Sequence, residues 1–301
     1  MSDKTILVAG RAGQVARALT SAALPPGLRI AARGRPDLDL LDVASIEKTL
    51  DEVSPALVVN AAAHTAVDQA ESDEAACMAL NAEAPGVLAA SAAQRGIPVI
   101  HLSTDYVFDG TKQAPYVEAD PVTPLGVYGR SKLDGERRVA AANPDHVILR
   151  TAWVYSPVGR NFVRTMLRLA AQREEVSVVH DQRGNPTSAA DIAAAIVAIA
   201  GQYLSGGSGA APGLYHMTAS GEASWAEFAE HVFACSAAAG GPSARVRKIT
   251  SLEYPTPVQR PANSRLDCAH LAAVYGIRLP HWQESARACV EQLVKTGEWT
   301  S

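Results

Sequence analysis

Cysteine is scarce in this chain of 301 residues, and its four copies stand far apart, at positions 77, 235, 268 and 289. No two of them form a C-x-x-C pair, and no histidine-rich tract accompanies them. This spacing argues against a disulfide framework and against a metal site built on thiolates. We therefore expect reduced cysteines, a cytoplasmic protein and no bound metal.

Long apolar runs and basic clusters are also missing. The 27 Lys and Arg are scattered among 31 Asp and Glu, and the net charge is −4, so no nucleic-acid-binding arm is indicated. No apolar run approaches the roughly 18 residues of a membrane span. The first residues, Met-Ser-Asp-Lys, lead straight into a short apolar run, which is not the layout of a signal peptide. Nucleic-acid and membrane partners are not expected.

The chain is 48% apolar and 19% charged, which suits a full core and one or two domains. Short apolar runs alternate with helical patterns up to about residue 154, and this predicts an α/β fold of the Rossmann type, a doubly wound parallel sheet with helices on both faces. The predicted strands are Thr5–Ala9, Leu28–Ala32, Ala56–Asn60, Gly96–Ser103 and His146–Tyr155.

Beyond residue 154 the pattern loosens. We expect residues 1–154, with returning segments near 176–200, to form the main domain, and residues 155–175 and 201–301 to form mainly a smaller lobe at the carboxyl edge of the sheet. Val176–Asp181 is interpreted as a sixth strand and Ser188–Ala200 as a capped helix. Leu204–Pro212 is Gly/Ser-rich and is interpreted as a surface loop.

A glycine turn, Gly10-Arg-Ala-Gly13-Gln-Val-Ala16, follows the first strand. A strand, a glycine turn and a helix are the layout of a dinucleotide-binding unit, in which the pyrophosphate rests on the helix N-terminus. The second strand ends in Arg33 without an acid at its tip, which favours the 2′-phosphate of NADPH over NADH. The alternative is that Arg33 is a solvated loop charge. An adenine pocket near Asp39 and Leu40 is a further expectation.

Tyr128 and Lys132 are four residues apart, which places both on one face of a predicted helix. A nearby ammonium favours the phenolate and lowers the pKa of a tyrosine, so the pair suits proton transfer to or from a carbonyl or alcohol oxygen. The hydroxyl of Thr104, at the end of the fourth strand, would bond the same oxygen. Such a pair is also common on helix surfaces, so the pattern alone leaves both interpretations open.

Other strand ends support the catalytic interpretation. Ala61–Ala63 are small enough for a ligand to approach the backbone, and Trp153 would stack on or wall a substrate, although a tryptophan is as often part of the core. Carboxyl ends of parallel strands share one crevice. Asn81 lies in a predicted helix interior, where asparagine is unfavourable; it either bonds neighbouring backbone or is exposed.

Together, G-x-x-G-x-x-A, N-A-A-A, S-T-D-Y-V-F-D-G and Y-G-x-S-K resemble the extended short-chain dehydrogenase/reductase family, and the resemblance spans Ile6 to about Trp282. Within that family the chain looks like the reductases of dTDP-linked 4-keto sugars. The resemblance implies hydride delivery to C4 from NADPH, or also NADH, and protonation of the oxygen by Tyr128, with Lys132 and Thr104 assisting. The implied cofactor-binding residues are Gly10, Arg11, Ala12, Gly13, Gln14, Val15, Arg33, Asp39, Leu40, Ala61, Ala62, Ala63, His64, Thr65, Tyr128 and Lys132. The implied substrate-binding residues are Thr65, Val67, Thr104, Asp105, Trp153, Arg260 and Asn263.

Two alternatives stay open. One is a sugar-nucleotide epimerase or dehydratase of the same family. The other is a non-catalytic NADP-binding regulatory subunit, although such proteins often lose the Tyr or the Lys. A homodimer is possible within the family; some members bridge it with a metal held by acidic side chains, but Val15, Ala189 and Ala190 supply no acid, so no metal-bridged dimer is expected.

Overall fold

Six parallel strands form the centre of the protein. The computed structural model describes residues 3–205 and 211–300, and its main sheet has the strand order β10-β5-β4-β3-β1-β2. The strands are β1 (Lys4–Ala9), β2 (Leu28–Arg33), β3 (Leu57–Asn60), β4 (Val99–Thr104), β5 (His146–Thr151) and β10 (Gly213–His216), all paired in parallel. The predicted Rossmann-type sheet is confirmed.

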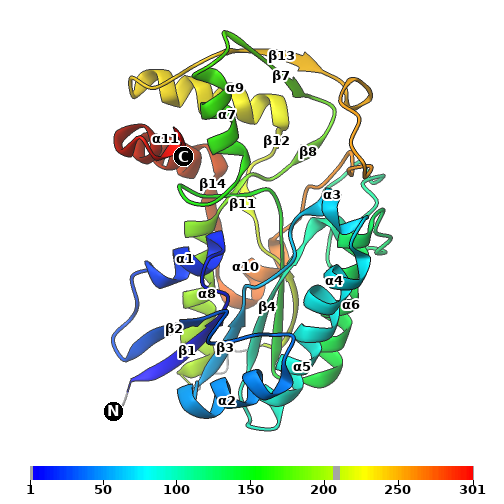
Figure 1. Cartoon of the computed structure of the whole chain (residues 1–301), viewed down its shortest axis with the longest axis vertical. Coiled ribbons are helices and arrows are strands. Elements are labelled where there is room, and N and C mark those ends of the chain that lie inside the picture. Colours follow the sequence, from blue (N-terminus) through cyan, green and yellow to red (C-terminus); the bar gives the residue numbers. More distant parts are fainter. Residues whose placement is uncertain (1–2, 206–210, 301) are drawn as a thin grey trace.

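Helices cover both faces of this sheet (Figure 1). On one face lie α1 (Gln14–Thr20) and α8 (Ala189–Leu204); on the other lie α2 (Val43–Val53), α5 (Ala84–Ala93) and α6 (Val127–Ala142). Successive side chains of β1 point to opposite faces of the sheet and so contact both helix layers. Ile6 and Val8 pack with α1 and α8, and Leu7 packs with α2 and α5. Because both faces are buried, the strands are continuous apolar runs.

The segment between β3 and β4 is not the single helix predicted after Glu71 and through about Ala93. It comprises α3 (Val67–Ala70), α4 (Glu74–Met78), a π-helical turn η1 (Ala79–Glu83) and α5. The helix-unfavourable Asn81 lies in the π turn. Gly135 of α6 permits close packing there, since a Cβ on Gly135 would lie 2.1 Å from the carbonyl oxygen of Asn81. Such π bulges often occur at functional sites.

A second cluster of elements lies at the other end of the molecule, at the top of Figure 1. It contains α7 (Phe162–Ala170), β7 (Glu175–Val179), α9 (Trp225–Ala238), β13 (Arg245–Ile249) and α11 (Trp282–Thr296), which share an apolar core. We call this cluster the C-terminal lobe.

The prediction of Val176–Asp181 as a sixth strand of the main sheet is wrong: β7 pairs with β13, and the sixth strand is β10. The reason is visible in the burial of β7, where Val176 and Val178 are buried but Glu175 and Ser177 are exposed. A strand with one solvent-exposed face does not suit the middle of a sheet that helices cover on both sides. Helix α10 (Ala269–Tyr275) also contacts the core of the main sheet, through Leu271 and Tyr275.

Short elements complete the chain. They are β6 (Val154–Tyr155), β8 (Arg183–Gly184), β9 (Thr187–Ser188), β11 (Ala219–Ser220), β12 (Ala223–Ser224), β14 (Leu279–His281) and the 3-10 turns η2 (Asp105–Val107), η3 (Ser251–Glu253) and η4 (Glu298–Thr300). The predicted cap at Ser188 is confirmed. Residues 206–210 of the predicted loop Leu204–Pro212 lie outside the described residues. Across residues 3–205 and 211–300, none of the helices has the length and apolar character needed to cross a bilayer.

Candidate active site

The crevice for a dinucleotide lies between β1 and β3. In the sheet, β2 lies on one side of β1, and β3 followed by β4 lies on the other side. The direction of strand addition therefore reverses between β1 and β3, and ligands of doubly wound sheets bind at such a switch point. Gly10 has φ +111°, and a Cβ there would lie 3.4 Å from the backbone of Ala61 and Ala62. Gly13 caps α1 without a side-chain hydrogen bond, so the first N–H groups of the helix stay free for an anion. The described residues therefore fit a pyrophosphate.

Tyr128 stands on the first turn of α6, next to the end of β4. Its ring meets that of Tyr106 edge to face, with centroids 5.6 Å apart. Burial raises the pKa of Tyr128 above its ordinary value, although the side chain of Thr104 acts in the opposite direction. The net shift is opposite to the predicted lowering, and it keeps the phenol protonated at neutral pH.

Lys132 lies one turn further along α6 and is almost fully buried. Its amine donates to the carbonyl of Leu102 at 2.7 Å and lies 3.3 Å from Nε2 of His101. Burial lowers the pKa of Lys132 to about 8, while the nearby Glu136 acts in the opposite direction. The amine is therefore bound to β4, and Lys132 is not among the main causes of the Tyr128 pKa shift.

Thr104 and Asp105 form a buried polar pair at the end of β4. The hydroxyl of Thr104 lies 3.0 Å from Oδ1 of Asp105 and accepts a bond from the amide of Tyr106. Burial raises the pKa of Asp105 to about 6. Asp105 is only 2% exposed, so its carboxyl group contacts Thr104 within the protein and does not face open solvent.

Two further buried groups support the Tyr–Lys helix. The side chain of Asn60 lies 3.2 Å from Nδ1 of His101. The other ring nitrogen of His101, Nε2, faces the amine of Lys132. Glu136 accepts two hydrogen bonds from the guanidinium of Arg150, at 2.8 and 2.7 Å, and one from Ser103 at 2.5 Å. These contacts hold α6 against β4 and β5.

Asn81 connects α6 with the loop after β3. Its side chain accepts from the amide of His64 at 2.7 Å and donates to the carbonyl of His64 at 3.0 Å and to the hydroxyl of Ser131 at 3.0 Å. The sequence left open a bond with the backbone of a neighbouring strand or an exposed position; in the structure Asn81 is fully buried and bonds the backbone of the loop after β3. His64 thus has a fixed position in the crevice wall.

The remaining predicted cofactor residues lie around the same crevice. Arg11 forms an exposed ion pair with Asp37 at 3.2 Å, and Arg33 donates to the backbone of Ala32. Asp39 accepts the amide of Leu41. Leu40, by contrast, is buried in the core beside α2.

Gln14 projects from α1 towards the C-terminal lobe. Its side-chain oxygen accepts hydrogen bonds from Ser156 at 2.9 Å and from Asn161 at 3.0 Å. Thr65 is exposed and Val67 is half-buried at the start of α3, so both lie at the surface of the loop that follows β3.

The predicted substrate residues are used differently from one another. Trp153 is half-buried and lies between β5 and β6. Arg260 donates to the hydroxyl of Tyr106 at 3.0 Å and pairs with Asp68 at 2.9 Å, so it already has partners in the absence of a substrate.

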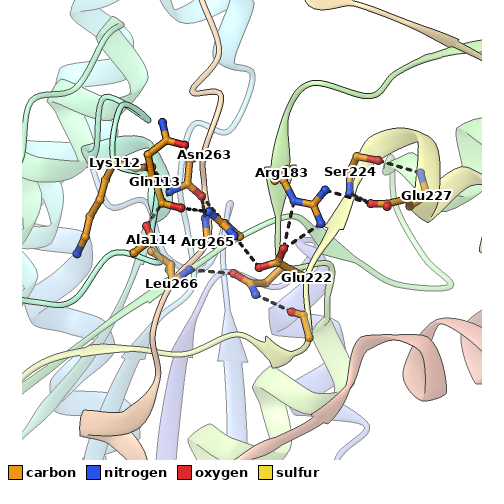
Figure 2. A network of polar contacts seen from close by, with 12 residues as sticks. Lys112, Gln113, Ala114, Arg183, Glu222, Ser224, Glu227, Asn263, Arg265 and Leu266 are labelled. Atoms are coloured by element: carbon orange, nitrogen blue, oxygen red, sulfur yellow. Dashed lines mark hydrogen bonds and ion pairs between the residues drawn. The ribbon is translucent and has the colours of Figure 1, made fainter.

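Asn263 is almost fully occupied by structural contacts (Figure 2). It donates to the carbonyls of Lys112 and Ala114, at 2.7 and 2.9 Å, and accepts from Nε of Arg265 at 2.8 Å. This does not support the expected role of Asn263 as a substrate-binding residue, because its hydrogen-bonding capacity is used within the protein.

Sequence reasoning missed His101, Asn60, Glu136, Arg150 and Trp225. A signal existed for Glu136, which lies a further turn beyond Lys132 on the same face of the helix. No sequence signal distinguishes His101 from other polar residues in a buried strand. Among the described residues there is no group of three or more His, Cys, Asp and Glu side chains that would suit a metal ion.

The fold and the site define an NAD(P)-dependent oxidoreductase of the extended short-chain dehydrogenase/reductase type. Residues 4–295 match the family described as the RmlD substrate binding domain. A dTDP-4-dehydrorhamnose reductase of Sinorhizobium fredii (strain NBRC 101917 / NGR234) is 49% identical over 293 residues, which cover 97% of this chain and 99% of the relative. The chain belongs to the dTDP-4-dehydrorhamnose reductase family.

Solved structures agree. A crystal structure of a dTDP-4-dehydrorhamnose reductase from Clostridium acetobutylicum ATCC 824 has a TM-score of 0.89 and 36% identity, covering 96% of this chain and 99% of that one. The dTDP-4-dehydrorhamnose reductase from Bacillus anthracis str. Ames, solved in complex with NADP, has the same TM-score, 30% identity and the same coverage. The resemblance that the sequence motifs indicated is confirmed over nearly the whole chain.

Proposed function

We propose that this protein reduces the C4 keto group of dTDP-4-dehydro-L-rhamnose to the alcohol of dTDP-L-rhamnose, the last step of dTDP-rhamnose biosynthesis. The observation that carries the proposal is the convergence of Tyr128, Thr104 and Lys132 at the carboxyl end of β4, beside a crevice that fits a dinucleotide. The family supplies the substrate class. The NADP bound in the B. anthracis relative supports NADPH as the cofactor.

In the proposed reaction NADPH supplies the hydride to C4, and this chain supplies the proton to O4. Tyr128 gives its phenolic proton to the oxygen as negative charge develops there. A phenol is protonated at neutral pH, and burial raises the pKa of Tyr128 further. Thr104 holds the oxygen and phenol together. Lys132 would bond the nicotinamide ribose, and Gly10–Val15 and Ala61–Thr65 would line the remainder of the cofactor.

The location of the protein is a further part of this proposal. All four cysteines are free thiols, and unpaired cysteines are typical of a reducing compartment. We propose that it acts in the cytoplasm.

The test is an absorbance assay with purified protein, dTDP-4-dehydrorhamnose and either NADPH or NADH. Net oxidation of the reduced nicotinamide is expected, with Tyr128→Phe slower by about 10²- to 10⁴-fold, as for loss of a general acid. The variant should still bind NADPH, measured by its fluorescence. Absence of net oxidation by the wild type would favour an epimerase or dehydratase, and full turnover by Tyr128→Phe would remove this residue as the acid.

A further inference from the structure

Trp153 has a backbone conformation that needs external support. Its φ is +46°, in the left-handed region that bulky residues rarely adopt. It lies between β5 and β6, and its carbonyl accepts the amide of Thr187 at 3.2 Å. A residue stays in such a conformation only where the surrounding structure imposes it.

Trp225 contacts the indole of Trp153 face to face. The ring centroids are 3.6 Å apart and the planes differ by 7°. Aromatic pairs usually prefer offset or edge-to-face arrangements with centroids at about 4.5–7 Å, so this close stack is imposed by the elements that carry the two rings. Phe162 of α7 packs against Trp225 in turn, at 4.7 Å, and ties the stack to the C-terminal lobe.

Gly184 makes the second contact. A Cβ at this position would lie 2.4 Å from Cε2 and 2.7 Å from Nε1 of Trp153, so any larger residue would have to displace the indole. No left-handed φ is involved at Gly184. The requirement for glycine is therefore steric and comes from Trp153.

Gly184 and Trp225 are placed by one pair of short strands. Gly184 pairs with Ala223 where β8 and β12 run antiparallel. Ser224 ends β12 and caps α9, whose first residue is Trp225, and Glu227 completes the capping box. The two contacts of the indole therefore depend on the same local structure.

A charged network reinforces these strands (Figure 2). Arg183 donates to Glu222 at 2.9 and 3.2 Å, and Glu222 also accepts from Arg265 at 2.8 Å. Arg265 donates to Asn263, and Asn263 donates to carbonyls of the loop at 112–114, which follows the active-site strand β4. The network therefore joins β8 and β12 to the part of the molecule that carries β4.

We propose that Trp225, which the comparisons assign no role, is a positioning residue that sets the orientation of Trp153 as a wall for the sugar, with Gly184 as the second support. This rests on the proposed function, because it takes Trp153 as a substrate wall. Trp225 acts through Trp153 and does not touch the reacting atoms. The geometry of the sugar site is thereby set by the N-terminus of α9 in the C-terminal lobe.

The experiment is a double-mutant cycle on the affinity for the product sugar nucleotide, which shares the sugar site with the substrate. The dissociation constant of dTDP-L-rhamnose, measured by calorimetry with NADP present, should rise about 2- to 12-fold in Trp225→Ala, the worth of one aromatic pair. In a Trp153→Ala background, Trp225→Ala should alter this dissociation constant less than about twofold, because the side chain of Trp153, through which Trp225 acts, is absent. Trp225→Phe should retain part of the affinity, and kcat should change less than affinity.

Two further variants test the idea without deleting a large side chain. Gly184→Ala should weaken binding in the same way and lose its effect in the Trp153→Ala background. Gly201→Ala is its control, since a Cβ at Gly201 has no atom within 4 Å. Trp282→Phe, another buried tryptophan of the lobe, is the control for Trp225→Phe and should leave the affinity unchanged.

An equal loss of affinity from Trp225→Ala with and without Trp153 would overturn the proposal, as would unchanged binding in both Trp225→Ala and Gly184→Ala. So would a Trp153→Ala variant that binds the sugar nucleotide like the wild type. Failure of the proposed function would show differently, as wild-type protein that binds the sugar nucleotide but does not oxidise NADPH with the keto sugar.

Discussion

The amine of Lys132 donates a hydrogen bond of 2.7 Å to the carbonyl of Leu102, within β4. This bond joins the helix that carries Tyr128 to the strand that carries Thr104. It also holds a cationic group in a buried position, where its charged form is disfavoured. The position of the lysine is thus determined by the backbone of β4 as well as by its helical spacing from Tyr128.

The first prediction concerns the pH dependence of stability. The folded-state pKa of Lys132 is about 8, below its ordinary value of 10.5, so between these values the unfolded chain binds more protons than the folded chain. Stability from this group therefore rises with pH across that window, by at most about 1.4 kcal/mol per pH unit.

Urea unfolding of wild type and Lys132→Met at pH 7.5, 8.5 and 9.5 measures this effect. The free energy of unfolding of the wild type should increase relative to Lys132→Met as the pH rises. Taking the difference between the two proteins cancels other titrating groups to a first approximation. A difference that stays constant over these pH values would contradict the pKa assignment.

The second prediction concerns the ion pair of Arg150 and Glu136, whose side chains are 4% and 6% exposed. Glu136→Gln should destabilise the protein by about 3–5 kcal/mol, because it leaves a buried guanidinium without its counter-charge. Replacing both partners with methionine should cost much less. Denaturant unfolding gives the free energies.

The same helix offers a control for this ion pair. Arg138 and Asp134 form an exposed pair at 2.9 Å, and Asp134→Asn should cost less than about 1 kcal/mol. Similar losses from Glu136→Gln and Asp134→Asn would show that burial does not determine the contribution of the Arg150 pair.

The third prediction concerns Gly129, directly after Tyr128. A Cβ at this position would lie 2.2 Å from the carbonyl oxygen of Tyr106. Because this oxygen belongs to the backbone, it cannot move away at low energetic cost. Gly129→Ala should lower the melting temperature and the turnover rate together, although alanine is the better helix former. In contrast, Gly201→Ala in α8 meets open space and should stabilise the protein by about 0.4–1 kcal/mol.

Thermal unfolding followed by circular dichroism, with the reductase assay on the same samples, measures both effects. Equal melting temperatures for Gly129→Ala and Gly201→Ala would be incompatible with a close approach of α6 to the turn η2.

The fourth prediction concerns the choice of cofactor. Arg33 ends β2. Within residues 3–205 and 211–300 it has no acidic partner, and its side chain donates to the carbonyl of Ala32. If it meets the 2′-phosphate, Arg33→Ala should raise the KM for NADPH about 10- to 150-fold, the range for a hydrogen bond to a charged group, and leave that for NADH nearly unchanged.

Arg29→Ala provides the comparison, since Arg29 lies exposed near the other end of β2. It should leave both KM values unchanged. A parallel change of the NADPH and NADH values in Arg33→Ala would show that this residue does not read the phosphate.

The sequence by itself determined the layers of the fold and the positions of the main chemical groups. The apolar runs at Ile6–Ala9 and Leu57–Val59 predict buried parallel strands because both of their faces need cover. Spacing along a helix is enough to put Tyr128 and Lys132 on one face, and the glycine turn at Gly10 predicts a dinucleotide crevice.

Only the tertiary structure decided how those groups are held. The partner of β7, the hydrogen bonds of Lys132 and the stacking of Trp153 on Trp225 join residues far apart in the chain. Burial likewise reverses the expected shift of the Tyr128 pKa. A local sequence pattern indicates which face of an element is apolar. It contains no information on which distant element covers that face, which decides strand pairing, or on how much water remains near a side chain, which decides its pKa.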